Sequence, residues 1–379
     1  MHFSIATLLS VLVTSASAQV KGTPYGFAKG VTGGGSATIQ TPSSIAELTA
    51  WLSDSTARVI NIDREWDFTG TRASGAGCDR ISCSANNGGQ LYLGTLSCGG
   101  SDNVAATVNY DTAGPTALKV GSNKSIISNN RKGVLKGKGL SLVSGASNVI
   151  IQGIEIKQIN PAVVWGGDAL DFQGNNNGVW VDHMKFSTTG RMFIVTHYNA
   201  VRATISNSEF DGRTSSSASC NGNHYWTMMF YGNGDRITFD RNYLHDVSGR
   251  APKVGDGTVG VTFQATNNYF LNMKGHAFDI YNQASTLIEG NAFSSVSQPM
   301  TSESASANSV FNSVNLTNCA AFLGRNCVAN SLTSSGSWPG KTGEGPLRAF
   351  QAAKDYLVTP VAASGVASLV LANAGPSKL

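Results

Sequence analysis

The sequence predicts an all-β protein, a single-stranded right-handed parallel β-helix with loops that form a cleft on one face. Two observations lead to this fold class. Of the 379 residues, 43 are glycine and only 13% are charged, a composition typical of strands and turns rather than of long helices. Short runs of alternating apolar residues also recur at uneven intervals, which favours a solenoid whose coils carry loops of different lengths.

The repeated unit is a short apolar run that contains one small polar turn. The equivalent turn positions, separated by 30, 24, 34, 26 and 23 residues, are Ile154, Met184, Ser208, Asn242, Asn268 and Asn291. These intervals leave room for one or two strands in each unit but not for a long helix. Because the coils of a solenoid stack in register, we expect the asparagines to form a side-chain ladder, in left-handed backbone that Asn tolerates. The crossover rule for parallel strands predicts the right hand, and helices are predicted near the ends, at 43–52 and 347–356.

Residues 1–18 are predicted to be a signal peptide, which leaves residues 19–379 as one β-helix domain. An apolar run without charge at 3–13 precedes the small-residue cleavage site Ala16-Ser17-Ala18. We therefore expect a secreted, extracellular protein whose six cysteines form three disulfides. Triplets at Asn123 and Asn315 are candidate glycosylation sites.

The charge pattern argues against two classes of partner. The net charge of +4 comes from 27 basic and 23 acidic residues, without a basic run that would bind phosphates, so we expect no nucleic-acid partner. No later stretch approaches the about 18 apolar residues that span a bilayer. We therefore expect no membrane partner, and we expect a monomer.

Four charged residues occupy positions where a solenoid can bring them together. Asp168, Arg191, Arg250 and Lys253 each follow a predicted strand, where loops present side chains. Because neighbouring coils join residues that are tens of positions apart in the sequence, one carboxylate and three cations can converge. Pro252 restricts the loop between the last two cations. The alternatives are an ordinary turn cap for Asp168 and a loop ion pair with Asp168 for Arg250.

Three aromatic residues, Trp165, Tyr225 and Trp226, are candidates for substrate binding because the apolar faces of sugar rings stack on aromatic side chains. The alternative for each is packing in the core. Asp182 and His183 lie inside an alternating strand, and we expect both to be structural.

Several segments resemble the pectate lyase and pectin lyase superfamily (polysaccharide lyase family 1), over residues 22–372. They include Trp165-Gly-Gly-Asp-Ala, Val179-Trp-Val-Asp-His and Arg250-Ala-Pro-Lys. Pectate lyases of this superfamily place acidic calcium ligands after the Trp-x-Asp-His strand, whereas this chain has Phe186-Ser-Thr-Thr-Gly-Arg. Within the superfamily it resembles the fungal pectin lyases, which implies β-elimination with Arg250 as the catalytic residue, and no metal or other cofactor.

The resemblance also implies the disulfides Cys78–Cys98, Cys83–Cys220 and Cys319–Cys327, whereas six cysteines alone allow 15 pairings. The second bond would join an N-terminal loop to the loop of Tyr225 and Trp226. Related pectin lyases carry tryptophans between the first three cysteines, but this chain has Asp79, Arg80 and Tyr92. The number of aromatic subsites is therefore left open.

The chemistry of elimination gives a separate reason for a site rich in cations. The reaction removes the C5 proton of a uronate, beside its carboxyl carbon. In a methyl ester that carboxyl is neutral, so fixed cations can stabilise the enolate-like transition state without calcium. A guanidinium is a poor base because its pKa exceeds about 12, although neighbouring cations would lower that pKa. Arg250 is thus either the base or an electrostatic stabiliser while another group or water takes the proton.

The sequence therefore predicts a secreted pectin lyase that cleaves methyl-esterified pectin (homogalacturonan) internally. The alternatives are a calcium-dependent pectate lyase and a non-catalytic β-helix that binds cell-wall polysaccharide. A β-helix polygalacturonase would need paired carboxylates, and the sequence has no matching cluster.

Overall fold

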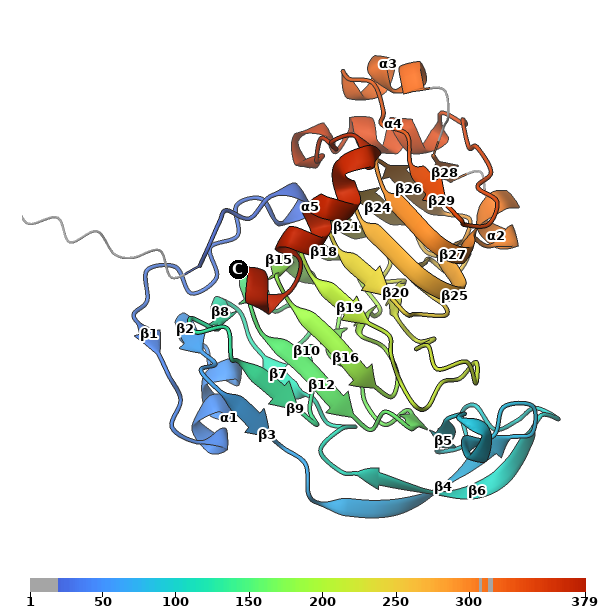
Figure 1. Ribbon diagram of the computed structural model, residues 1–379. Helices are drawn as coiled ribbons and strands as arrows, with labels where there is room; N and C mark the ends of the chain where they lie inside the picture. The colour runs from blue at the N-terminus through green and yellow to red at the C-terminus, as the bar shows by residue number, and fades with distance from the viewer. Residues whose placement is uncertain (1–19, 307–308, 313–315) are drawn as a thin grey trace, which may run out of the picture.

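The computed structural model describes residues 20–306, 309–312 and 316–379. Three parallel sheets run along one column, and each coil passes through sheets I, II and III before returning to sheet I (Figure 1). The predicted parallel β-helix is therefore confirmed. The predicted signal peptide and Asn315 lie outside the described residues.

Each sheet is a stack of short strands from successive coils. In spatial order, sheet I consists of β1 (Ile39–Gln40), β2 (Arg58–Asn61), β8 (Lys124–Ile127), β11 (Val149–Gln152), β15 (Asn176–Asp182), β18 (Val201–Ser206), β21 (Asp235–Asp240), β24 (Val261–Thr266), β26 (Ala284–Glu289) and β28 (Val310–Phe311). In the same direction, sheet II consists of β3 (Glu65–Asp67), β9 (Val134–Lys136), β12 (Glu155–Ile159), β16 (Lys185–Thr189), β19 (Glu209–Asp211), β22 (Tyr243–His245), β25 (Tyr269–Ile280), β27 (Ala292–Met300) and β29 (Ser331–Thr333). Sheet III consists of β7 (Leu118–Val120), β10 (Leu140–Leu142), β14 (Leu170–Phe172), β17 (Ile194–Thr196), β20 (Met228–Phe230), β23 (Lys253–Val254) and the end of β25.

Among the described residues, a smaller sheet and five α-helices surround the column. The small sheet consists of β13 (Val163–Val164), β5 (Leu91–Leu93), β4 (Arg72–Arg80) and β6 (Asn103–Asp111). The helices are α1 (Ile45–Ser53), α2 (Ser302–Ser306), α3 (Ala320–Leu323), α4 (Gly345–Gln351) and α5 (Val366–Asn373). In the described part of the chain, no helix has the length and apolar character needed to cross a membrane.

Successive strands of sheet I pair at the intervals that the sequence predicts. The paired positions, which are 30, 24, 34, 26 and 23 residues apart, are Val149, Val179, Ala203, Ile237, Phe263 and Thr286. Side chains of one kind therefore stack inside the column. The ring centroids of Phe186 and Phe210 lie 5.1 Å apart, and those of Phe270 and Phe293 lie 4.6 Å apart, close to the spacing of adjacent strands.

The predicted asparagine ladder is also present inside the column. Asn268 Oδ1 accepts the backbone N–H of Asn242 at 2.9 Å, and Asn291 Oδ1 accepts that of Asn268 at 2.9 Å. Ser208 and Asn330 each add one rung. The expectation of left-handed backbone at these asparagines is wrong, because the preceding residue makes the sharp bend from sheet I to sheet II. These left-handed residues are His183, Asn207, Arg241, Asn267 and Gly290.

Asp182 joins neighbouring coils from a buried position, as its place in the strand predicts. Its carboxylate accepts hydrogen bonds from Gln152 at 2.9 Å and from Ser206 at 2.7 Å, and it contacts the ring of His183 at 2.6 Å. Asp182 and His183 are therefore structural.

Helix α1 closes the N-terminal end of the column, as predicted. Ser44 caps it by accepting the N–H of Glu47 at 3.2 Å, a typical N-cap interaction. Leu48 and Leu52 enter the end of the core.

The C-terminal segment is more broken than predicted. The helix expected over 347–356 is divided into α4 and a 3-10 turn at Lys354–Tyr356. Leu347 and Phe350 cover the last strands of sheet I. Helix α5, which the sequence pattern did not reveal, packs Val366 and Val370 on Tyr269 outside sheet II (Figure 1).

The structure contains the disulfides Cys78–Cys98, Cys83–Cys220 and Cys319–Cys327, the pairs that the family resemblance implies. The first two hold the long hairpin of β4 and β6, which projects from the column (Figure 1). Strand β5 pairs with β13, and so the hairpin is fastened beside the loop that begins at Trp165. Tyr92 of β5 is buried against Cys78.

We expect Asn268→Ala to lower the free energy of unfolding by about 3 kcal/mol, because each buried polar group left without a partner costs about 1–3 kcal/mol. The groups concerned are the carbonyl of Phe239 and the main-chain and side-chain N–H groups of Asn242. Equilibrium denaturant unfolding measures the loss. Asn282→Ala at an exposed turn is the matched control and should change stability by less than about 0.5 kcal/mol. Equal losses in the two variants would show that the ladder does not stabilise the column.

Candidate active site

The outer face of sheet III carries a row of aligned side chains, one from each of the six strands from β7 to β23. In spatial order these are Lys119, Ser141, Asp171, Val195, Met229 and Lys253. Their neighbours Leu142 and Phe172 point into the core, so the strand alternation places the row outside. The turns that lead into these strands add a second row along one edge, consisting of Asp168, Arg191, Trp226 and Arg250.

Asp168 and Arg191 form an ion pair between adjacent coils. Arg191 Nη1 lies 2.7 Å from Asp168 Oδ2, and Asp168 Oδ1 accepts the N–H of Met192 at 2.9 Å. The ring of Trp165 lies 4.0 Å from the guanidinium carbon of Arg191, which adds a cation–π contact. Burial raises the pKa of Asp168, and the charge of Arg191 opposes this. Asp168 is thus paired with Arg191 of the neighbouring coil and is more than an ordinary turn cap.

Arg250 is held in a constrained backbone conformation. Its φ is +48°, and its N–H donates to Nε2 of His276 at 2.9 Å. Burial lowers the pKa of His276, and the charge of Arg250 acts in the same direction, so the imidazole is neutral and can accept this hydrogen bond. The peptide bond between Ala251 and Pro252 is cis. Sequence reasoning missed His276 because only the three-dimensional stack brings it to Arg250.

The guanidinium of Arg250 lies over an aromatic surface. Its central carbon is 4.8 Å from the ring centre of Trp226 and 5.8 Å from that of Tyr225. The two rings meet edge to face at 5.0 Å. Within the residues that the structure describes, no carboxylate lies at ion-pair distance from Arg250. The ion pair with Asp168, which the sequence left open as the alternative for Arg250, is therefore absent there, and no carboxylate offsets the charge of Arg250.

Lys253, the first residue of β23, is a second cation beside the turn of Arg250. Its ammonium lies 4.4 Å from the ring centre of Tyr281. Burial and then the charge of Arg250 lower the pKa of Lys253. The four predicted residues thus form two groups, Arg250 with Lys253 and Arg191 with Asp168, and the coil of Trp226 lies between them.

A buried glutamine fixes Trp226 in the cleft wall. Its Oε1 accepts the indole N–H of Trp226 at 3.1 Å, and its amide donates to the carbonyls of Pro161 and Gly190, both at 2.8 Å. This residue, Gln90, follows Cys83 in the loop that the Cys83–Cys220 disulfide joins to the Trp226 segment. Sequence reasoning did not identify it, since a lone Gln in a loop carries no signal.

At the other edge of this row, where the sheet III strands end, a histidine contacts both a tyrosine and an aspartate. His197 Nδ1 lies 2.8 Å from the hydroxyl of Tyr231, and Nε2 lies 3.1 Å from Asp171 Oδ1. Tyr198, which is 67% exposed, extends this rim. His197, Tyr198 and Tyr231 directly follow the sheet III strands β17 and β20, but these strands are too short for a sequence pattern to reveal that alignment.

A cavity of about 550 Å³ opens beside the Asp168–Arg191 pair. Trp165, Asp171 and Gln173 line it, and it extends to Lys119 on β7. The cavity thus runs from the Asp168–Arg191 pair towards the N-terminal end of the column.

The two carboxylates that line this cavity, Asp168 and Asp171, do not fit a calcium site. Calcium takes about six to eight oxygen ligands, but Asp168 binds Arg191, and Asp171 faces His197 and accepts a hydrogen bond from Ser141 at 3.2 Å. Both carboxylates therefore already have side-chain partners within the protein.

Comparison with known proteins gives the family. A family model described as "Pectate lyase" matches residues 94–379. The chain belongs to the pectate lyase family. It is 46% identical to "Probable pectin lyase F-2" of Aspergillus terreus, over 98% of this chain and 77% of that protein. It is 44% identical to "Probable pectin lyase F-1" of the same species, over 99% of both chains.

Solved pectate lyases share the fold of this family member. "Pectate lyase bound to hexasaccharide" has a TM-score of 0.57 at 14% identity and covers 94% of this chain and 98% of its own. A Bacillus pectate lyase in complex with trigalacturonate has a TM-score of 0.57 at 18% identity, over 93% of this chain and 98% of its own.

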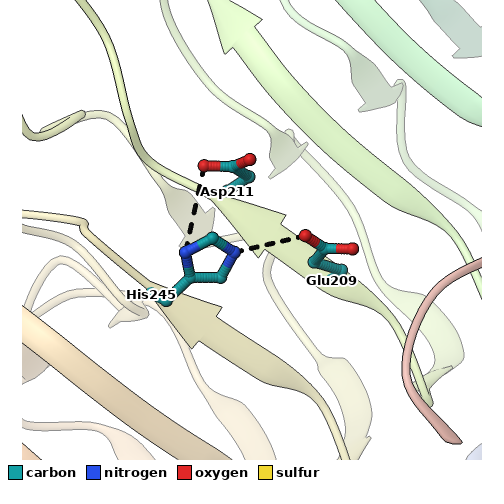
Figure 2. Close-up of side chains that lie close together, drawn as sticks. All are labelled: Glu209, Asp211 and His245. Atoms are coloured by element: carbon teal, nitrogen blue, oxygen red, sulfur yellow. Dashed lines mark hydrogen bonds and ion pairs between the residues drawn. The ribbon is translucent and has the colours of Figure 1, made fainter. Parts of the chain in front are cut away.

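In this pectate lyase family member, a second cluster of titratable side chains lies on sheet II, away from the cleft. Figure 2 shows the imidazole of His245 between Glu209 and Asp211, with Nε2 3.2 Å from the former and Nδ1 3.9 Å from the latter. The two ring nitrogens point in opposite directions, each towards one carboxylate. The imidazole and the two carboxylates therefore do not converge on one metal ion. Lys185 and Arg213 bind the same carboxylates. The cluster is therefore an ion-pair network between coils.

We expect the contribution of His245 to stability to depend on pH. Burial acts to lower the pKa of His245, but hydrogen bonds to Glu209 and Asp246 raise it overall. A raised folded-state pKa gives stability that is fully present below the unfolded value of about 6.5 and is lost as pH rises through the folded pKa. His245→Gln should therefore cost about 2 kcal/mol at acidic pH, where the charged hydrogen bonds exist, and less at alkaline pH.

His224 provides a control, because the pH dependence of its contribution to stability has the opposite sign. Burial lowers the pKa of His224 to about 4, so its contribution is present above the unfolded value of about 6.5 and is lost as pH falls. The deficit of His224→Gln relative to the wild type should thus shrink in acid. Urea unfolding across this pH range measures both variants, and a pH-independent deficit for His245→Gln would contradict the ion-pair assignment.

Proposed function

We propose that this chain is a secreted pectin lyase. It cleaves (1→4)-α-D-galacturonan methyl ester internally by β-elimination, without a metal ion, and leaves 4-deoxy-6-O-methyl-α-D-galact-4-enuronosyl ends. The observation that carries the proposal is the Arg250 guanidinium, which has no carboxylate partner among the described residues and lies near Lys253. The pectin lyase names of relatives along nearly the whole chain support the substrate.

The elimination removes the C5 proton and places negative charge on the ester carbonyl of the same sugar unit. The C5–H bond breaks, its electron pair forms the C4=C5 double bond, and the C4–O4 bond breaks while the leaving oxygen gains a proton. Negative charge develops on the ester carbonyl as C5 loses its proton. Arg250 and Lys253 supply fixed positive charge for this oxygen, and preorganised charge of this kind makes a major contribution to the rate enhancement of many enzymes.

The remaining site residues position the substrate chain. Arg191, fixed by Asp168, gives a third cation on the next coil but one. The rings of Trp165, Tyr225 and Trp226 are proposed to stack on sugar faces. Arg250 acts on the C5 proton itself or on the charge that its removal creates.

Secretion, glycosylation and a monomeric state belong to the same proposal. Three disulfides suit an oxidising compartment. Asn123 is exposed, and its Oδ1 accepts a hydrogen bond from Asn148 at 2.8 Å, which leaves its amide nitrogen as the attachment atom. The cleft is built from one chain, so a monomer would suffice.

A calcium-dependent pectate lyase is the second candidate, because the matching family model and the solved neighbours carry that name. Incubation with highly methylated pectin and with polygalacturonate, each with and without EDTA, separates the candidates. We expect ultraviolet-absorbing unsaturated product from methylated pectin, unaffected by EDTA. Product from polygalacturonate that EDTA abolishes would establish the pectate lyase. New reducing ends without absorbance would mean hydrolysis, and no product from either polymer would favour a binding protein.

We expect Arg250→Ala to lower kcat on methylated pectin by more than about a hundredfold, because losing one preorganised electrostatic partner typically costs about 10²–10³. Arg250→Lys should not restore full activity, since an ammonium lacks the planar fork of a guanidinium. Thermal unfolding should change little in either variant. The matched control is Arg236→Ala, an exposed arginine on β21 of sheet I, which should keep wild-type kcat. A folded Arg250→Ala variant with more than about a tenth of wild-type kcat would refute the assignment.

A further inference from the structure

The cleft cavity extends well beyond the residues assigned to the reaction. Its far end is formed by Lys119 on β7 and by Thr116 in the preceding turn, and its near end by Asp168 and Arg191. Five strand steps separate Lys119 from Lys253 along sheet III, which at about 4.8 Å per step is about 24 Å. A sugar unit of a 1,4-linked chain is comparable in length to one such step. Lys119 therefore lies several sugar units from the reacting bond.

The charges that line this cavity are compensated except at that far end. Asp168 is paired with Arg191 at 2.7 Å, and Asp171 faces His197 at 3.1 Å. Among the residues that the structure describes, no carboxylate lies at ion-pair distance from the ammonium of Lys119. The side chain is exposed, so its charge is available to a bound ligand.

The ligand chemistry follows from this unpaired cation. A methyl ester is neutral and gains little from an ammonium group, whereas a free carboxylate forms an ion pair with it. Pectin that is partly de-esterified contains both groups along one chain. We propose that Lys119 forms a subsite for an unesterified galacturonosyl residue, so that this lyase favours chains with a free acid several units from the methyl-esterified cleavage point. This inference rests on the proposed function.

The expected effect is small because the pair is exposed. Exposed ion pairs contribute about 0.2–1 kcal/mol, which corresponds to a preference of up to about fivefold in kcat/KM. Salt screens such a pair, with a Debye length of about 10 Å at 0.1 M, so the preference should weaken as ionic strength rises.

The test compares Lys119→Gln with Lys132→Gln, an exposed lysine in the turn after β8 that undergoes the same change of charge. The measurement is the ratio of kcat/KM on partly de-esterified pectin to that on fully methylated pectin of equal length. Lys119→Gln should lower this ratio about two- to fivefold, and Lys132→Gln should leave it at the wild-type value. Mass spectrometry should find a free acid enriched at one fixed distance from the cleaved bond in wild-type products but not in those of Lys119→Gln.

Each outcome decides the proposal. An unchanged ratio in Lys119→Gln, or an equal fall in Lys132→Gln, would overturn the subsite even though pectin is cleaved. Wild-type protein that leaves fully methylated pectin intact would instead refute the proposed function. In that case calorimetric titration with trigalacturonate decides whether Lys119 binds a carboxylate, because Lys119→Gln alone should then weaken binding.

Discussion

Register between coils is the constraint on which this structure depends. A slip of one residue would exchange the inner and outer faces of every strand, and the row from Lys119 to Lys253 would then enter the core. Inward-facing phenylalanines and the asparagine ladder both penalise such a slip, the first by packing and the second by unsatisfied hydrogen bonds. The loops between strands carry no such restriction. They differ in length from coil to coil, and four of them deliver the charged and aromatic side chains of the cleft.

The cleft concentrates positive charge that the fold must hold in place. Arg250 and Lys253 repel one another, as the lowered pKa of Lys253 shows after the larger effect of burial. Aromatic faces of Trp226 and Tyr281 partly offset this repulsion. His276 fixes the left-handed backbone of Arg250 through a neutral ring nitrogen. Strained backbone is often found at functional sites, where the surrounding structure overdetermines it.

The sequence predicts the column better than it predicts the cleft. Coil intervals and the ladder could be predicted because each coil repeats a local pattern of apolar and polar residues. Asp168, Arg191, Arg250 and Lys253 could be named from motifs, but their division into two groups depends on which strand of sheet III each turn precedes. Gln90, His197 and His276 could not be found, because the partner of each is supplied by a residue more than twenty positions away in the sequence. Helix α5 was missed since it packs on a surface that exists only after the coils have stacked.

Helix α1 also affects whether another chain can pair with the N-terminal end of the column. A stack of parallel coils presents unpaired main-chain groups at its terminal turn, and such an edge is a template for another chain. Here Leu48 and Leu52 fill the open mouth of the core, and the carbonyl of Leu52 accepts the N–H of Gly121 beside the first strand of sheet III. The outermost strand of sheet I, β1, is only two residues long. Together they leave little strand edge at this end of the column on which a second chain could add a strand.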